Sequence, residues 1–243
     1  MLKTETRRIR AGGASLRSCT SGVALIEFAF ALPVLLALGL MGLETANYAM
    51  AHLRVSSIAM LTADNAARVR ESIDESDITE LFTGAKLSGA SIQFAQNGRI
   101  ILTDLEQRDG TTQWIRWQRC DGALSYTNPD VKLRPRTAAG AAITNGTEIY
   151  NADRFTPNTT NPSSDVTSPV IFGMGSTTTI AAQPGTAVMV VEVVYNYQPI
   201  IPNSFLAGRQ IRYESAFNVR QRNDQVLKNS GRITPRSCNT FAA

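Results

Sequence analysis

The apolar residues of this 243-residue chain fall into one long run near the N-terminus and several shorter, alternating runs further along. The long run, VALIEFAFALPVLLALGLMGL at residues 23–43, has the length of about 20 residues that a helix needs to cross a bilayer. It contains a single charged residue, Glu27, and one proline, which membrane helices tolerate better than soluble helices do. We therefore predict a transmembrane segment over residues 23–43.

The helical pattern continues beyond this run. Apolar and small side chains recur at three- and four-residue spacing through residues 44–72, and charged residues occupy the rest of the helical wheel. The pattern predicts one helix from residue 20 to residue 72, in which residues 44–72 continue the helix beyond the apolar run. Two helices broken near residues 39–44 are the alternative.

Residues 73–243 predict an α+β head. Asp77 and Glu80 have the spacing of an N-cap and its third helical residue, so a short helix is expected there, ending at Gly84. Asn97-Gly98 is the strongest short hairpin signal, and the alternating residues 92–94 before it and the apolar run after it predict two strands.

Three further runs extend the predicted antiparallel sheet. TTQWIRWQRC, residues 111–120, offers a third strand whose packing groups are Trp114, Ile115 and Trp117. AVMVVEVVYNYQP, residues 187–199, predicts a central strand with Met189, Val191, Val193, Tyr195 and Tyr197 on one face. GRQIRYESAFNVRQR, residues 208–222, places Ile211, Tyr213, Phe217 and Val219 inward and Arg212, Glu214, Asn218 and Arg220 outward. Between the first and second of these runs, residues 121–169 are rich in Asn, Thr, Pro, Ser and Gly and predict a long loop.

The net charge of +4 belongs to the N-terminal tail. The acidic residue of residues 1–22 is Glu5, and the five basic residues are Lys3, Arg7, Arg8, Arg10 and Arg17. The rest of the chain has equal numbers of acidic and basic residues. No basic stripe occurs elsewhere in the sequence, which argues against nucleic-acid binding. Positive charge before the apolar run and none after it until Arg54 predicts a cytoplasmic N-terminus and an extracytoplasmic body.

Several classes of targeting segment share this composition. A cleaved signal peptide has a small-x-small site in Ala49-Met50-Ala51, but its apolar core is usually only about 7–15 residues long. An uncleaved signal anchor fits the length. A lipoprotein attached through Cys19 fits less well, because that cysteine precedes the apolar run.

A further class accounts for the glutamate. Gly22 is followed by Val23, and Glu27 is the fifth residue counted from Val23, with Phe28 beside it. Here the sequence resembles the prepilins of type IV-like systems, which have a basic leader ending in glycine and an apolar helix with glutamate at its fifth position. The run GVALIEFAFALPVLL specifically resembles the TadE-like minor pilins, or pseudopilins, of the Tad (Flp) pilus, and residues 190–222 are similar to the late strand pair of that family.

The resemblance implies a pilin-like α+β fold, in which the extracytoplasmic half of the long helix packs against the antiparallel sheet of a globular head. It also implies a processing step. A prepilin peptidase would remove the leader, residues 1–22, and expose the α-amine of Val23. Glu27 would then neutralise the amine of a neighbouring subunit within the membrane, since removing both charges from water together costs less than burying either alone. A glutamate that only reaches back to the membrane interface is the alternative.

The resemblance also implies the partners and the location of the protein. The partners are a prepilin peptidase, other pilins and pseudopilins of the Tad system, an inner-membrane assembly platform and the membrane itself. We expect a single-pass protein of the inner membrane, with its head outside the cytoplasm and with incorporation into a surface pilus.

The cysteines follow from the same processing step. Cys19 would leave with the leader, so Cys120 and Cys238 would remain as an even pair in an oxidising compartment, and we predict a disulfide between them. Two unrelated buried thiols are the alternative.

Enzymatic chemistry has few candidate residues in this sequence. The one histidine, His52, follows the apolar run and is expected to be solvated, and neither a metal cluster nor a Ser-His pair is predicted. We therefore expect no catalytic residue and no cofactor. Two functions remain: a TadE-like minor pilin that contributes to pilus assembly and adherence, and an uncleaved membrane-anchored module for extracytoplasmic binding or sensing.

Overall fold

A computed structural model describes residues 21–110, 112–125, 173–174, 179–202, 204–236, 238 and 240–243. The chain divides into two compact units, residues 1–45 and residues 46–243. The predicted leader lies outside the described residues except for residues 21–22, and so does the predicted loop at 121–169 except for residues 121–125.

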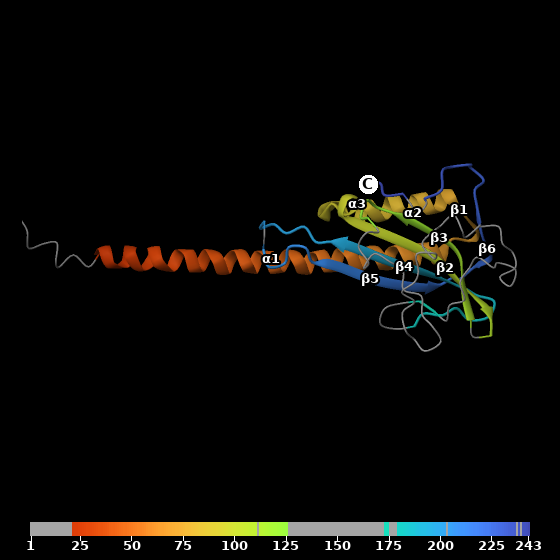
Figure 1. Ribbon diagram of the computed structural model, residues 1–243, viewed down its shortest axis with the longest axis horizontal. Helices are drawn as coiled ribbons and strands as arrows, with labels where there is room; N and C mark the ends of the chain where they lie inside the picture. Colours follow the sequence, from red (N-terminus) through yellow and green to blue (C-terminus); the bar gives the residue numbers. More distant parts are fainter. Residues whose placement is uncertain are drawn as a thin grey trace, which may run out of the picture. The chain divides into compact units, whose positions relative to one another are not determined.

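Helix α1 is one uninterrupted helix, Ser21–Arg68, so the alternative of two helices broken near residues 39–44 is wrong. In the second unit its buried side chains recur every three or four residues and are mostly small. They are Ala51, Val55, Ile58, Ala59, Thr62, Ala63, Ala66 and Ala67. Small side chains at these positions let the helix backbone approach the sheet closely, and they share one apolar cluster with the strands. Figure 1 shows this part of α1 running along the sheet.

Within the part of the chain that the structure describes, four antiparallel strands form a sheet in the order β3-β2-β4-β5. They are β2 (Gly98–Asp109), β3 (Thr112–Asp121), β4 (Ala187–Asn196) and β5 (Gln210–Asn218). A long N-terminal helix and an antiparallel sheet confirm the predicted α+β class.

The two faces of the sheet belong to two separate apolar clusters. The face toward α1 carries every second residue of the central strands, including Ile100, Leu102, Met189, Val191 and Val193. The opposite face carries Ile101, Leu105, Ile115, Val188 and Val190. Because side chains alternate between faces with a period of two, the register of β2 on β4 fixes both clusters at once.

The runs at residues 111–120, 187–199 and 208–222 form strands as predicted, whereas the strand predicted around residues 92–94 is wrong, because a 3-10 turn and a short helix occupy that segment. Strand β4 lies between β2 and β5, and the five residues assigned to one face of it all join the cluster against α1. In β5 and just after it, Ile211, Tyr213, Phe217 and Val219 pack on the same cluster. The packing groups of β3, Trp114, Ile115 and Trp117, are fully buried.

A second, two-stranded sheet was not predicted. Strand β1 (Glu71–Asp74) follows α1 in the chain. It pairs in parallel with β6 (Arg222–Lys228). Both strands are polar, with Ile73 and Leu227 as their buried apolar residues, so neither has the alternation that marks a strand in the sequence.

The predicted N-cap of the short helix is wrong by one turn. Helix α2 is Glu75–Ser88, and Asp74 is its N-cap. The Ser76 amide donates to Asp74 Oδ1 at 3.1 Å, and the Asp74 amide donates to Asp77 Oδ2 at 2.8 Å. Asp77 is therefore the third helical residue of a capping box, not the cap itself. The helix also continues past Gly84 because Ala85 is buried beyond it.

The predicted turn at Asn97-Gly98 is also wrong. Residues before Gly98 form a 3-10 turn, Ala90–Ile92, and the short helix α3, Phe94–Asn97, joined by Gln93 at a φ of 52°. Burial of the Phe94 side chain overrides the local hairpin signal, because its ring occupies the space beside Gly98. The hairpin that does form joins the end of β2 at Asp109 to the start of β3 at Thr112, and Gly110 between them has a φ of +44°.

Candidate functional site

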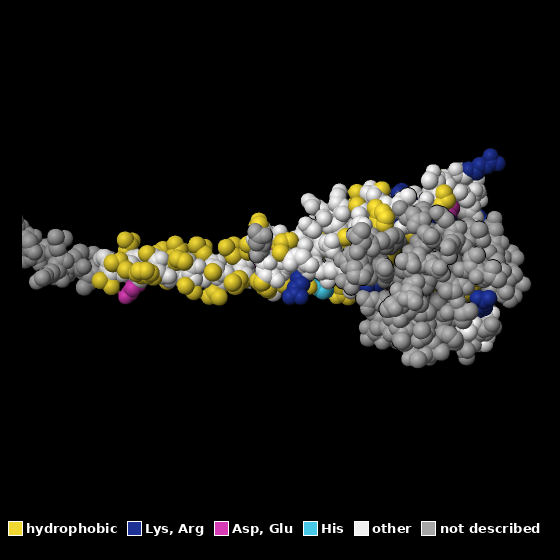
Figure 2. All heavy atoms as spheres, viewed as in Figure 1, with side chains coloured by type: hydrophobic (Ala, Val, Ile, Leu, Met, Phe, Trp, Pro, Cys, Tyr) yellow, Lys and Arg dark blue, Asp and Glu magenta, His cyan; other side chains and the backbone are white. Residues whose placement is uncertain are grey.

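The first unit consists, in its described part, of the apolar half of α1. Every described side chain from residue 22 to residue 43 is exposed, including Leu25 at 73% and Phe30 at 77%. Hydrophobic side chains cover this part of the helix in Figure 2. Among the described residues, α1 is the one helix that is long and apolar enough to cross a membrane. An apolar surface that no protein covers is what a bilayer-spanning helix presents.

The predicted processing and assembly residues all lie at the start of this helix. Gly22, Val23, Glu27 and Phe28 are helical and exposed. Val23 and Glu27 are four residues apart and therefore lie on the same face, one turn from each other. A Cβ added at Gly22 would meet no atom within 4 Å, so the fold itself does not require a glycine there.

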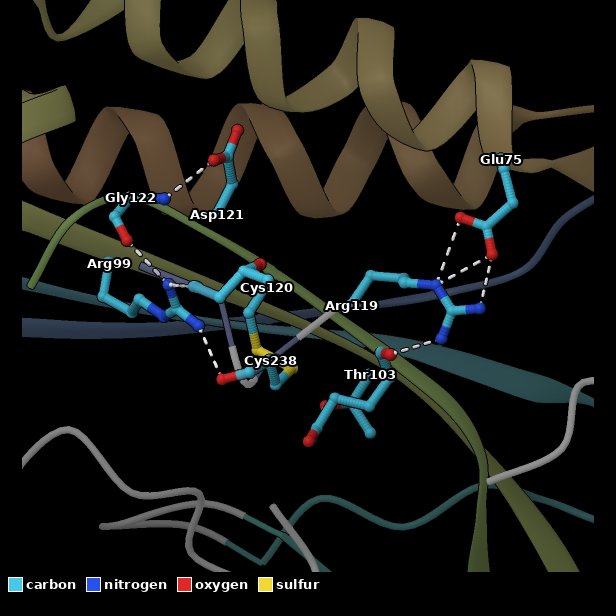
Figure 3. Close-up of a disulfide and its surroundings, with 10 residues drawn as sticks. Glu75, Arg99, Thr103, Arg119, Cys120, Asp121, Gly122 and Cys238 are labelled. Atoms are coloured by element: carbon cyan, nitrogen blue, oxygen red, sulfur yellow. Dashed lines mark hydrogen bonds and ion pairs between the residues drawn. A yellow bond between two sulfur atoms is a disulfide. The ribbon is translucent and has the colours of Figure 1, made fainter. Parts of the chain in front are cut away.

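In the second unit, the structure contains the disulfide between Cys120 and Cys238, whose Cα atoms are 4.7 Å apart (Figure 3). Both cysteines are buried in the apolar cluster on the face of the sheet away from α1. The Cys120 amide also donates to the Arg236 carbonyl at 3.1 Å. The bridge thus attaches the C-terminal tail to β3.

Arg99 holds the same tail from the neighbouring strand, a role that no pattern in the sequence indicates. Its buried guanidinium donates to the carbonyls of Gly122 at 2.6 Å, Thr240 at 2.7 Å and Cys238 at 2.9 Å. It also lies 4.5 Å from the ring centre of Phe241. Figure 3 shows Arg99 beside the disulfide, so one covalent bond and one cation secure the tail together.

Two further buried ion pairs connect elements of the head. Arg119 on β3 donates through Nε to Glu75 Oε1 at 2.9 Å and also contacts this carboxylate through Nη2, which ties the sheet to the first turn of α2. Arg222 lies 3.9 Å from Asp104 and donates to the carbonyl of Ala66 at 3.3 Å, near the end of α1. Burial raises the pKa of Asp104 well above its ordinary value, with repulsion from Glu106 as the second cause.

The sequence predicted a solvated His52, but the structure shows this side chain in contact with two tyrosines. Its Nδ1 lies 3.2 Å from the hydroxyl of Tyr213, and its ring packs edge-on against Tyr48 with a centroid distance of 4.6 Å. Partial burial lowers the pKa of this imidazole. The described residues include no group of three or more His, Cys, Asp or Glu that could hold a metal ion.

These features define a class: an α+β protein whose N-terminal helix is half sheet-packed and half suited to a membrane. Residues 22–69 match the model of the family described as TadE-like protein. No curated protein and no solved structure matches the chain. The match begins at Gly22 and ends one residue after α1, so the resemblance that the sequence predicted is confirmed over this helix. This match covers 48 of the 243 residues, so it shows the similarity of the helix and not of the head.

Proposed function

We propose that the protein is a minor pilin, or pseudopilin, of a Tad pilus, matured by a prepilin peptidase and contributing to pilus assembly and surface adherence. The observation that carries the proposal is the single carboxylate of the apolar helix, five residues after a glycine that the fold does not need. The family match over the same residues supports it.

The carboxylate is costly unless it acquires a partner. A charge at the centre of a membrane helix costs roughly 2.5–3.5 kcal/mol on insertion scales, and less toward the edge. Cleavage after Gly22 would create the α-amine of Val23 at the membrane face. Pairing of this amine with Glu27 of another subunit would remove both charges from water together and set the register between subunits.

Processing is tested first. N-terminal sequencing of the protein from native membranes should give a chain that starts at Val23. Gly22→Leu should leave the full-length precursor, because a large side chain would block the bond to be cut. Gly39→Leu is the matched control: it lies in the same helix, its Cβ also meets no atom within 4 Å, and maturation should be normal. Normal maturation of Gly22→Leu, or a native chain that starts at Met1, would instead favour the uncleaved binding module.

Assembly is tested at Glu27. Glu27→Ala should still be cleaved, at least in part, but the unpaired amine should lower pilus formation. Removing one member of a buried pair costs about 3–5 kcal/mol, so the amount of assembled pilus should fall more than about tenfold. Glu27→Asp should be intermediate because it keeps the charge but moves it. The control is Glu80→Ala on the exposed face of α2. Unchanged piliation and surface attachment in Glu27→Ala would show that this carboxylate only reaches the interface.

A further inference from the structure

The connection between β4 and β5 exposes apolar side chains on the head. Ile200 is 53% exposed and Phe205 is 63% exposed, and both belong to the segment between Tyr197 and Gln210. Figure 1 shows this connection at the end of the sheet opposite to β6. Exposed apolar side chains are common on protein surfaces, so these two point to a partner only together with the surroundings of the loop.

The base of this loop is fixed to the first turn of α1 in the second unit. Asn47 donates through Nδ2 to the Tyr197 hydroxyl at 2.7 Å, and the rings of Tyr48 and Tyr197 are 4.9 Å apart. The Tyr197 amide also donates to the Arg209 carbonyl at 2.9 Å, which closes the loop at its base.

Chain connectivity alone places this base near the membrane segment. Asn47 comes four residues after Leu43, the last residue of the apolar run. Four residues span about 6 Å as a helix and at most about 14 Å when extended. The base of the loop therefore stays close to the end of residues 23–43, whatever direction the first unit takes.

The surroundings of the loop have the composition of a membrane interface. Tyrosines 48, 197 and 213 gather at its base, and tyrosine is enriched at the level of lipid headgroups. Neither residues 45–63 nor residues 193–213 contain an acidic residue, whereas Arg54 and Arg209 are exposed. A cavity of about 410 Å³ beside the loop is lined in part by polar side chains, namely Asn47, Ser91, Gln93 and Gln198.

We propose that the β4–β5 loop is a second membrane contact, in which Ile200 and Phe205 enter the interfacial region of the bilayer while Arg54 and Arg209 face anionic headgroups. Anionic lipid fits better than an acidic protein surface because the loop tip is apolar as well as flanked by cations. The proposal rests on residues 23–43 lying in the membrane, but it does not require cleavage after Gly22. It would hold the head against the membrane surface before assembly.

Fluorescence quenching tests the contact in the full-length chain. Phe205→Trp would be reconstituted in nanodiscs containing phosphatidylglycerol and lipids with brominated acyl chains. Trp114 and Trp117 are fully buried and supply a constant background. Phe205→Trp should lose most of its added fluorescence, and its emission should be blue-shifted. The control is Ile233→Trp in the tail after β6, which should not be quenched beyond the background. The Ile233 amide donates to Asn229 Oδ1, and the neighbouring Ser230 amide donates to Asp74 before α2.

Further variants distinguish a membrane contact from a protein contact. Equal quenching of Phe205→Trp and Ile233→Trp would overturn the proposal. If the double variant Ile200→Ser/Phe205→Ser then lost its pili, the loop would be assigned to a protein partner instead. Combining Phe205→Trp with Gly22→Leu should leave the quenching intact, so failure of processing and failure of the membrane contact can be told apart. Replacing phosphatidylglycerol by phosphatidylcholine should weaken the quenching, and no change would overturn the role given to the two arginines.

Discussion

The role of a charged residue can be predicted from the sequence in the membrane helix but not in the head. Glu27 is conspicuous because one carboxylate interrupts an apolar run. Arg99, Asp104 and Arg222 are ordinary charged residues in the sequence, and only the fold brings each of them to a buried partner more than 20 residues away. Local pattern cannot reveal such pairs, because their partners come from other strands and from the C-terminal tail.

The buried Asp104 should make the stability of the head depend on pH. Its folded-state pKa is raised, so the folded protein binds this proton more tightly than the unfolded chain, where aspartate titrates near about 3.9. The resulting stabilisation is present at about pH 4 and is lost as the pH rises through the raised pKa. The melting temperature should therefore rise as the pH falls from neutral toward 4. Asp104→Asn should flatten that rise, and parallel profiles for the two proteins would contradict the assignment.

Asp74 should act in the opposite direction at lower pH. Hydrogen bonds from the amides of Ser230 and Ser76 lower its pKa to about 2 in the folded protein. This stabilisation is present above about pH 4 and is lost as the pH falls toward 2. Thermal unfolding of Asp74→Asn should show a smaller loss between pH 4 and pH 2 than the wild type. An unchanged acid limb would show that the two amides do not hold the carboxylate in solution.

Among the elements, those with sustained periodicity were predicted and those set by one tertiary contact were not. The 48-residue helix and the strands β3, β4 and β5 have patterns long enough to outweigh local signals. The Asn97-Gly98 signal is only two residues long, and the burial of Phe94 outweighs it. The parallel pair of β1 and β6 joins short polar segments far apart in the chain, which no local pattern can indicate.

Gly98 is needed for space rather than for a turn. A Cβ at this position would overlap the Phe94 ring, although the backbone φ of −124° suits any residue. Gly98→Ala should therefore destabilise the head by roughly 1–3 kcal/mol through overpacking. The free energy of unfolding in urea measures this effect. Adding Phe94→Leu should recover part of the Gly98→Ala loss, because the smaller side chain vacates the contact.

Gly84→Ala is the control for this prediction. Gly84 lies within α2, and an added Cβ would meet no atom within 4 Å. The same substitution should stabilise the head here by about 0.5–1 kcal/mol, since alanine is the better helix former. A hairpin turn at Asn97-Gly98 would instead make Gly98→Ala insensitive to the residue at position 94.

In the whole molecule, the family match covers the long helix, whereas the predicted architecture also includes the sheet of the head. The match covers α1 alone, whereas the sheet was predicted from alternation and its late strands from resemblance. The attachment of the tail was predicted only as a disulfide. Arg99, which binds two carbonyls of the tail, could not be foreseen because the tail has no regular pattern of its own.

The disulfide should contribute to the stability of the whole head. It joins cysteines 118 residues apart, and closing so long a loop stabilises a protein by roughly 2–4 kcal/mol, mainly by restricting the unfolded chain. Cys120→Ala/Cys238→Ala should lower the free energy of unfolding by that amount, while Arg99 still holds the tail in the folded state. Unreduced mature protein should bind no alkylating thiol reagent, and reduced, unfolded protein should bind it at two sites. Two labelled cysteines before reduction would contradict both the bridge in the native protein and an oxidising location for the head, since only an oxidising compartment maintains such a bond.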